Sequence, residues 1–141
     1  MKNNAIQRVL TIYYGVLQSA HLLTLLRASF IILQTGEIPF PALSPPGGWL
    51  PQAIPFLVGM GVVDAVAIVL ALIFVFQTNI RKNYQPIIGI ISMTIAMASA
   101  VQFAVGTIPS GAWSAHPLAY GLMVVLFAPV IPLYFLLLQS N

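Results

Sequence analysis

The sequence predicts an all-α membrane protein, a four-transmembrane-helix bundle, from its composition and the lengths of its apolar runs. Apolar residues make up 60% of the 141 positions and charged residues only 5%, whereas a soluble domain typically carries about 25% charged residues. Crossing a hydrocarbon core of roughly 30 Å takes about 20 apolar residues in a helix. Four runs reach that length, at residues 9–33, 53–76, 86–108 and 117–138. We expect them to form one domain over residues 1–141.

The first run, residues 9–33, carries polar side chains at intervals of three. Gln18, His21, Thr24 and Arg27 follow one another in this way and form a polar stripe that winds around the helix. The stripe should face protein, because an arginine that faces lipid costs about 2.5 to 3.5 kcal/mol on insertion scales. These interruptions also argue against a cleaved signal sequence, so we expect this helix to be retained.

The connection at residues 34–52 is the longest segment without an apolar helix pattern, and it is rich in proline. A stiff segment of this kind loses little entropy on docking, which favours a folded lid or a partner surface. A plain connector with an interfacial tryptophan is the other interpretation. The residues of the expected outer-loop partner surface are Glu37, Phe40, Trp49 and Trp113.

The second and third runs contain small residues four positions apart, which let helix backbones approach closely. These expected packing residues are Gly61, Ala65, Ser92, Ala96 and Ala100, and they predict that the two helices meet. The fourth run contains Pro129 and Pro132. Each proline removes a backbone donor, so we expect a bend in this helix.

Basic residues set the expected orientation. Lys2 and Arg8 precede the first helix, and Arg81 with Lys82 fill the turn between the second and third, whereas the other two connections have no Lys or Arg. The positive-inside rule therefore predicts that both termini are cytoplasmic. We expect a multi-pass integral membrane protein of a prokaryotic plasma membrane.

A weak internal similarity relates the two halves at an offset of seventy residues. Gly36, Ile38 and Pro39 correspond to Gly106, Ile108 and Pro109. Two parallel-repeat helical hairpins would give this pattern. Chance similarity between apolar helices would give it as well.

Two charges fall inside the predicted spans, Arg27 and Asp64. Counted from the outer helix ends, Arg27 lies about 10 Å deep, Asp64 about 16 Å, His21 about 19 Å and Gln102 about 9 Å. The expected intramembrane polar cluster therefore consists of His21, Thr24, Arg27, Asp64 and Gln102. In a structural interpretation Arg27 neutralises Asp64; in a functional one, Asp64 and His21 change protonation in a ligand or proton site.

The absences narrow the possible chemistry. There is no cysteine, and the sequence has no phosphate-binding glycine loop, no HExxH and no paired catalytic carboxylates. We therefore expect no enzyme, no metal site and no cofactor. His21 as an axial haem or pigment ligand is a minor alternative, since a bis-histidine haem needs a second histidine at facing depth.

The sequence leads to two functional hypotheses. The first is a non-catalytic accessory or scaffold subunit that takes part in complex assembly, with the lipid bilayer, other integral membrane subunits or a second copy as partners. The second is a self-contained ligand, ion or proton binding or transport protein that uses the intramembrane cluster. The few scattered basic residues do not form a nucleic-acid footprint, so no nucleic-acid partner is expected.

Overall fold

A computed structural model describes residues 5–80 and 85–140, and it contains the four predicted spans. Helix α1 covers Ala5–Thr35, α2 covers Ala53–Asn79 and α3 covers Pro86–Thr107. A short helix η1 (Ile108–Ser110) and helix α4 (Ala112–Ala115) form the next connection. The last span consists of α5 (Pro117–Phe127) and α6 (Val130–Gln139). Lys2, Arg81 and Lys82, three of the four residues behind the predicted orientation, lie outside the described residues.

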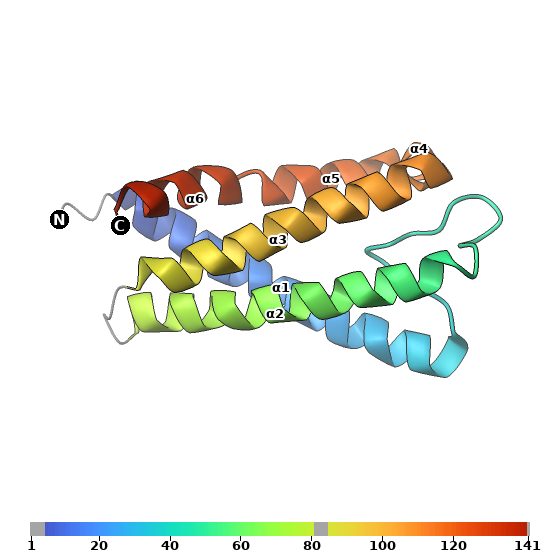
Figure 1. The fold of residues 1–141 in the computed structure, drawn as a ribbon, viewed down its shortest axis with the longest axis horizontal. Coiled ribbons are helices and arrows are strands. Elements are labelled where there is room, and N and C mark those ends of the chain that lie inside the picture. The colour runs from blue at the N-terminus through green and yellow to red at the C-terminus, as the bar shows by residue number, and fades with distance from the viewer. Residues whose placement is uncertain (1–4, 81–84, 141) are drawn as a thin grey trace.

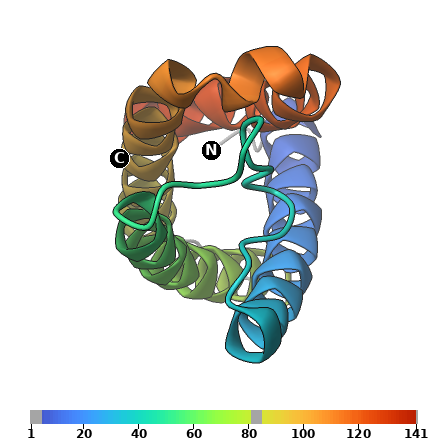
Figure 2. The same cartoon turned by 90° about the vertical axis from the view of Figure 1, so that its right-hand side faces the viewer.

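The four spans run alternately up and down and form a ring when seen along the bundle axis (Figures 1 and 2). Helix α2 packs most extensively against α3, then against α1, while α6 closes the ring by contacting α3 and α1. Helix α1 begins and α6 ends at the same end of the bundle (Figure 1). We call this the terminal end, and we call the opposite end, where residues 36–52 lie, the loop end.

The outward faces of the spans carry mostly apolar side chains. Val9, Leu23, Val62, Val101 and Val125 are each at least 60% exposed. Burying such side chains in lipid is favourable, whereas in water they would form a large apolar surface. The exterior and the lengths of the helices both fit a bundle that spans a bilayer.

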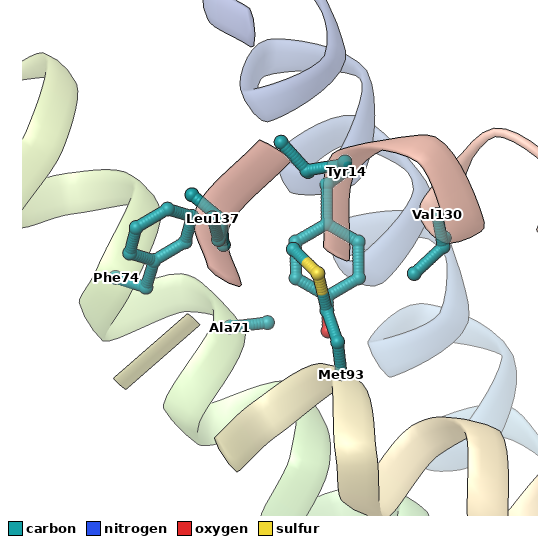
Figure 3. Close-up of a cluster of buried hydrophobic side chains, with 7 residues drawn as sticks. Tyr14, Ala71, Phe74, Met93, Val130 and Leu137 are labelled. Carbon is teal, nitrogen blue, oxygen red and sulfur yellow. The ribbon is translucent and has the colours of Figure 1, made fainter. Parts of the chain in front are cut away.

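The half of the bundle near the terminal end contains a cluster of buried, mostly apolar side chains. This cluster joins α1, α2, α3 and α6 (Figure 3). Tyr14 stands at its centre, surrounded by Phe74 and Ala71 of α2, Met93 of α3, and Val130, Leu133 and Leu137 of α6. This cluster closes the bundle interior toward the terminal end.

The fourth span is broken at the expected place. Ala128 and Pro129 form a turn between α5 and α6. The Ile131 N–H bonds to the Ala128 carbonyl, three residues earlier, and not to the carbonyl four residues earlier as in a regular α-helix. Proline at position 129 has no N–H to continue the helical ladder. Pro132 lies in the first turn of α6, where a missing N–H costs little.

The loop at residues 36–52 is folded against the bundle. Helix α1 ends where Gly36 takes a positive φ of 72° and its N–H bonds to the Ile32 carbonyl, an arrangement that favours glycine. The Leu43 carbonyl accepts from the Tyr120 hydroxyl at 2.7 Å, and the Ser44 carbonyl lies 3.0 Å from His116 Nε2. Figure 2 shows this segment crossing the end of the ring. Residues 43 and 44 of the loop are therefore held against the bundle, while a role as a lid or partner surface stays a prediction.

The four residues of the expected partner surface have different surroundings. Glu37 and Phe40 are exposed. Trp49 donates its indole N–H to the Ala42 carbonyl at 2.9 Å, inside the loop. Trp113 donates to Thr107 Oγ1 at 2.8 Å and stacks on Tyr120, with ring centroids 4.8 Å apart. Both tryptophans therefore stabilise the fold of the loop end.

The small residues of α2 and α3 divide between two interfaces. Ser92 and Ala96 are buried and Ala65 is half-buried, as expected for close packing. Gly61 instead faces α1, where a Cβ atom would lie 3.8 Å from Leu25. Ala100 is exposed, because the position that faces α2 is the neighbouring Ser99.

Candidate functional site: an intramembrane acid and imidazole

Asp64 is the centre of a polar cluster that joins three helices. Its Oδ1 accepts a hydrogen bond of 2.5 Å from the Ser99 hydroxyl of α3, and its Oδ2 lies 3.8 Å from Nε2 of His21 on α1. The second distance is within ion-pair range but is too long for a hydrogen bond. We call His21, Asp64 and Ser99 the Asp64 cluster. Its two titratable groups are close enough for the charge on one to affect the other strongly.

The cluster lies near the middle of the membrane. Asp64 is eleven residues from the start of α2 and His21 fourteen from the end of α1, which corresponds to depths of about 16 Å and about 21 Å. The side chains of His21 and Asp64 are nevertheless 32% and 25% exposed.

A second polar contact lies on the terminal side of Asp64. The Tyr14 hydroxyl and the Ser92 hydroxyl are 2.7 Å apart, and Ser92 donates to the Ala67 carbonyl at 2.8 Å. Tyr14 therefore donates to Ser92. Ala67 follows Asp64 by three residues, so the two polar groups of α2 lie about one turn apart.

Gln18 lies between these contacts on α1, four residues from Tyr14 and three from His21. Its side chain adjoins the Tyr14 hydroxyl and is only 1% exposed. Its Oε1 atom is buried and has no hydrogen-bond partner among the described residues. Buried carbonyl oxygens are nearly always paired, so this atom marks a place where an additional donor fits.

Three residues of the expected polar cluster lie away from Asp64. Arg27 and Gln102 are exposed on the bundle surface, and no hydrogen bond or ion pair joins Arg27 to Asp64. Thr24 is half-buried and donates to the Ala20 carbonyl of its own helix at 2.9 Å. The structure thus brings together His21 and Asp64, while the positive charge expected to neutralise the acid lies elsewhere.

The two histidines are in different regions. His21 adjoins Asp64, whereas His116 lies at the loop end against the Ser44 carbonyl. Within the described ranges 5–80 and 85–140, no group of three His, Asp or Glu side chains is placed to hold a metal ion. These positions do not form a bis-histidine haem site.

Ser99 and Ser92 belong to the site, but estimating the depth of each residue from the helix ends did not predict them as site residues. They are seven residues apart, with Ala96 between them, and therefore lie on one face of α3. The same seven-residue spacing occurs on α1, between Tyr14 and His21. Comparing these two spacings could have predicted that polar side chains of α1 and α3 face each other inside the bundle. Hydroxyl groups are common in membrane helices, however, so this sequence pattern is a weak predictor.

Comparison with known proteins gives no relative for this arrangement: no protein-family model, no curated protein and no solved structure matches the chain.

Proposed function

We propose that this chain is a non-catalytic, multi-pass membrane protein that takes up and releases a proton at the Asp64–His21 pair. The observation that carries the proposal is the 3.8 Å separation of Asp64 Oδ2 and His21 Nε2 near mid-membrane, with both side chains partly exposed. Ionisable groups at this depth are costly unless paired, and they typically mark a proton, ion or ligand pathway. Ser99 holds one carboxylate oxygen and leaves the other to exchange the proton.

Infrared spectroscopy in lipid bilayers tests this proposal, because the chain has only two acidic side chains. The absorption of a protonated carboxylic acid should appear and disappear as pH is varied. Asp64→Asn should abolish that band, whereas Glu37→Gln, which changes the exposed acid of the loop, should keep it. A band that survives in Asp64→Asn, or no pH-dependent band in the unmodified protein, would contradict the proposal.

A second function, an accessory subunit of a larger membrane complex, is favoured by a different observation. Arg27 and Gln102 are exposed at depths of about 12 Å and about 8 Å from the loop-end termini of their helices. Neither side chain has a hydrogen-bonded partner among the described residues. An acidic or amide side chain on a neighbouring membrane protein would satisfy them, since polar groups in lipid favour protein partners.

Native mass spectrometry of the chain extracted from its own membrane tests this second function. Co-migration at fixed stoichiometry with one membrane protein should be lost in Arg27→Leu and kept in Arg8→Gln, which alters an exposed arginine of the terminal end. A monomer or homo-oligomer in both variants and in the unmodified chain would contradict the accessory role.

A further inference from the structure

A pocket of about 320 Å³ lies at the loop end, between the end of α1, the connecting loop and the start of α2. It is lined by residues 36–38, Ser44, residues 48 and 49, and Ile54, and we call it the loop pocket. Because it lies at the level of the helix ends, in a bilayer it is placed where headgroups and water meet the hydrocarbon core. Its size falls within the range of small-molecule sites, roughly 300 to 1,000 Å³.

The walls of the loop pocket are held in place by contacts of the loop. The Ser44 carbonyl lies 3.0 Å from His116 Nε2, and the Trp49 indole N–H donates to the Ala42 carbonyl at 2.9 Å. Gly48 has a positive φ of 86°, which a residue with a side chain rarely adopts. A pocket whose walls are formed in advance loses less entropy when a ligand binds.

Two polar side chains of the lining have no partner within the described ranges. The Glu37 backbone N–H bonds to Thr35 Oγ1, but no hydrogen bond or ion pair joins the Glu37 carboxylate or the Ser44 hydroxyl to another described residue. An ionised carboxylate only accepts hydrogen bonds, and a serine hydroxyl can accept them as well. A ligand that donates hydrogen bonds would satisfy both groups.

Glu37 determines which sign of charge the loop pocket attracts. Residues 36–52 and 108–116 contain no Lys or Arg, and Glu37 is their only acid. Arg27 lies eight residues before the end of α1, about 12 Å along the axis, and no ion pair among the described residues joins it to Glu37. The end of α1 and the start of α2 both adjoin the pocket, and their helix dipoles have opposite signs. The carboxylate therefore favours a cation.

The rest of the lining fits an organic cation better than a metal ion. Ile38 and Ile54 supply apolar side chains and Trp49 an aromatic ring, and indole attracts ammonium groups more strongly than other aromatic rings do. A calcium ion takes about six to eight oxygen ligands. Within the described ranges, no group of three His, Asp or Glu side chains is placed to hold a metal ion.

We propose that the loop pocket binds an organic ammonium group, with the Glu37 carboxylate as its counter-ion and the Trp49 ring against its alkyl part. Two sources present such a group at this depth, a phosphatidylethanolamine headgroup and a soluble amine. The site is separate from the Asp64 cluster, because Asp64 lies about 16 Å farther into the bundle along α2.

An NMR titration in maltoside micelles with ethanolammonium chloride tests the site. Of the two tryptophans, Trp49 lines the loop pocket, whereas Trp113 donates to Thr107 Oγ1 outside it. The indole N–H resonance of Trp49 should shift and saturate, while that of Trp113 should stay in place. Ethylene glycol, which is uncharged and of similar size, should shift neither. Absence of a saturable shift at Trp49, or an equal shift with ethylene glycol, would overturn the proposal.

A variant of the acid tests its role in the same titration. Glu37→Gln should weaken binding of ethanolammonium about tenfold, because hydrogen bonds to a charged acceptor are stronger than those to a neutral one. Glu37 is exposed, so this variant should fold, and an unchanged Trp113 resonance would report that it has. Gln34→Leu, which alters an exposed polar residue of α1 outside the pocket, should bind as the unmodified chain does. Equal affinity in Glu37→Gln and the unmodified chain would overturn the assignment.

Nanodiscs of two compositions identify the source of the ammonium group. Discs of phosphatidylglycerol have no ammonium headgroup, whereas discs that also contain phosphatidylethanolamine do. If the headgroup is the ligand, the Trp49 resonance should differ between the two, and soluble ethanolammonium should move it only in phosphatidylglycerol. If a soluble amine is the ligand, the resonance should be the same in both discs and should move in both. A resonance that ethanolammonium moves in neither would overturn the proposal.

Discussion

The Tyr14 and Ser92 hydroxyls show how single polar residues shape this bundle. Both side chains are fully buried, and they form the chain Tyr14 to Ser92 to the Ala67 carbonyl across α1, α3 and α2. Water cannot replace a lost partner easily in such a place. The contact therefore fixes the relative rotation of three helices as well as contributing to stability.

A double-mutant cycle should measure this contact. Tyr14→Phe and Ser92→Ala should show a coupling free energy between the average of about 0.6 kcal/mol and the maximum of about 1.7 kcal/mol measured for hydrogen bonds between membrane helices. Unfolding in mixed detergent micelles, followed by circular dichroism, provides the free energies. The pair Tyr13→Phe and Ser92→Ala is the matched control, because the Tyr13 hydroxyl bonds to the Leu126 carbonyl at 2.6 Å and should not couple to Ser92.

At the scale of elements, helix contacts depend on where glycine occurs. At Gly89 of α3 a Cβ atom would lie 2.9 Å from Leu137 and 3.0 Å from the ring of Phe74, both fully buried. At Gly59 of α2 no atom lies within 4 Å of such a Cβ. The first glycine is required for close packing of α3 with α2 and α6, and the second is not.

Alanine substitutions should separate these two positions. Gly89→Ala should lower the free energy of unfolding by about 1 to 3 kcal/mol, because buried side chains must shift to admit the methyl group. Gly59→Ala should be neutral or slightly stabilising, since alanine favours helix over glycine. The same detergent unfolding assay compares them, and equal effects at both positions would show that the close contact at Gly89 carries no cost.

The loop at residues 36–52 is an element in its own right, held by side chains of the fourth span. Tyr120→Phe removes the bond to the Leu43 carbonyl while keeping the aromatic stack with Trp113. Amide hydrogen exchange should speed up across residues 40–46, with the helices unaffected, because local opening depends on local contacts. Tyr13→Phe, far from the loop, is the control. Unchanged exchange in Tyr120→Phe would mean that other contacts suffice to hold the loop.

At the scale of the whole molecule, a largely apolar exterior surrounds an interior that is mostly apolar and contains a few buried polar side chains. Lipid can cover the former, while the helices must satisfy the latter among themselves. The even number of spans brings the start of α1 and the end of α6 to one end (Figure 1). The positive-inside rule predicts that this end is cytoplasmic.

Cysteine labelling should decide the orientation, because the chain has no cysteine of its own. A membrane-impermeant maleimide added to intact cells should label Pro46→Cys at the loop end and fail to label Ser140→Cys at the terminal end. Permeabilised cells should label both. The opposite pattern in intact cells would reverse the predicted sidedness.

The sequence by itself determined the class, the number of spans and the break at Pro129, because span length, charge depletion and proline chemistry are local properties of the chain. It also identified Asp64 and His21 as polar groups at similar depth. Only the tertiary structure decided which groups meet. Counting residues from a helix end gives the position of a side chain along the helix axis but not the direction in which it points around that axis. Arg27 was therefore expected beside Asp64, whereas it lies exposed on the bundle surface. Ser99, one residue from a predicted packing position, bonds to the acid instead, because a rotation of 100° per residue separates neighbouring side chains on a helix.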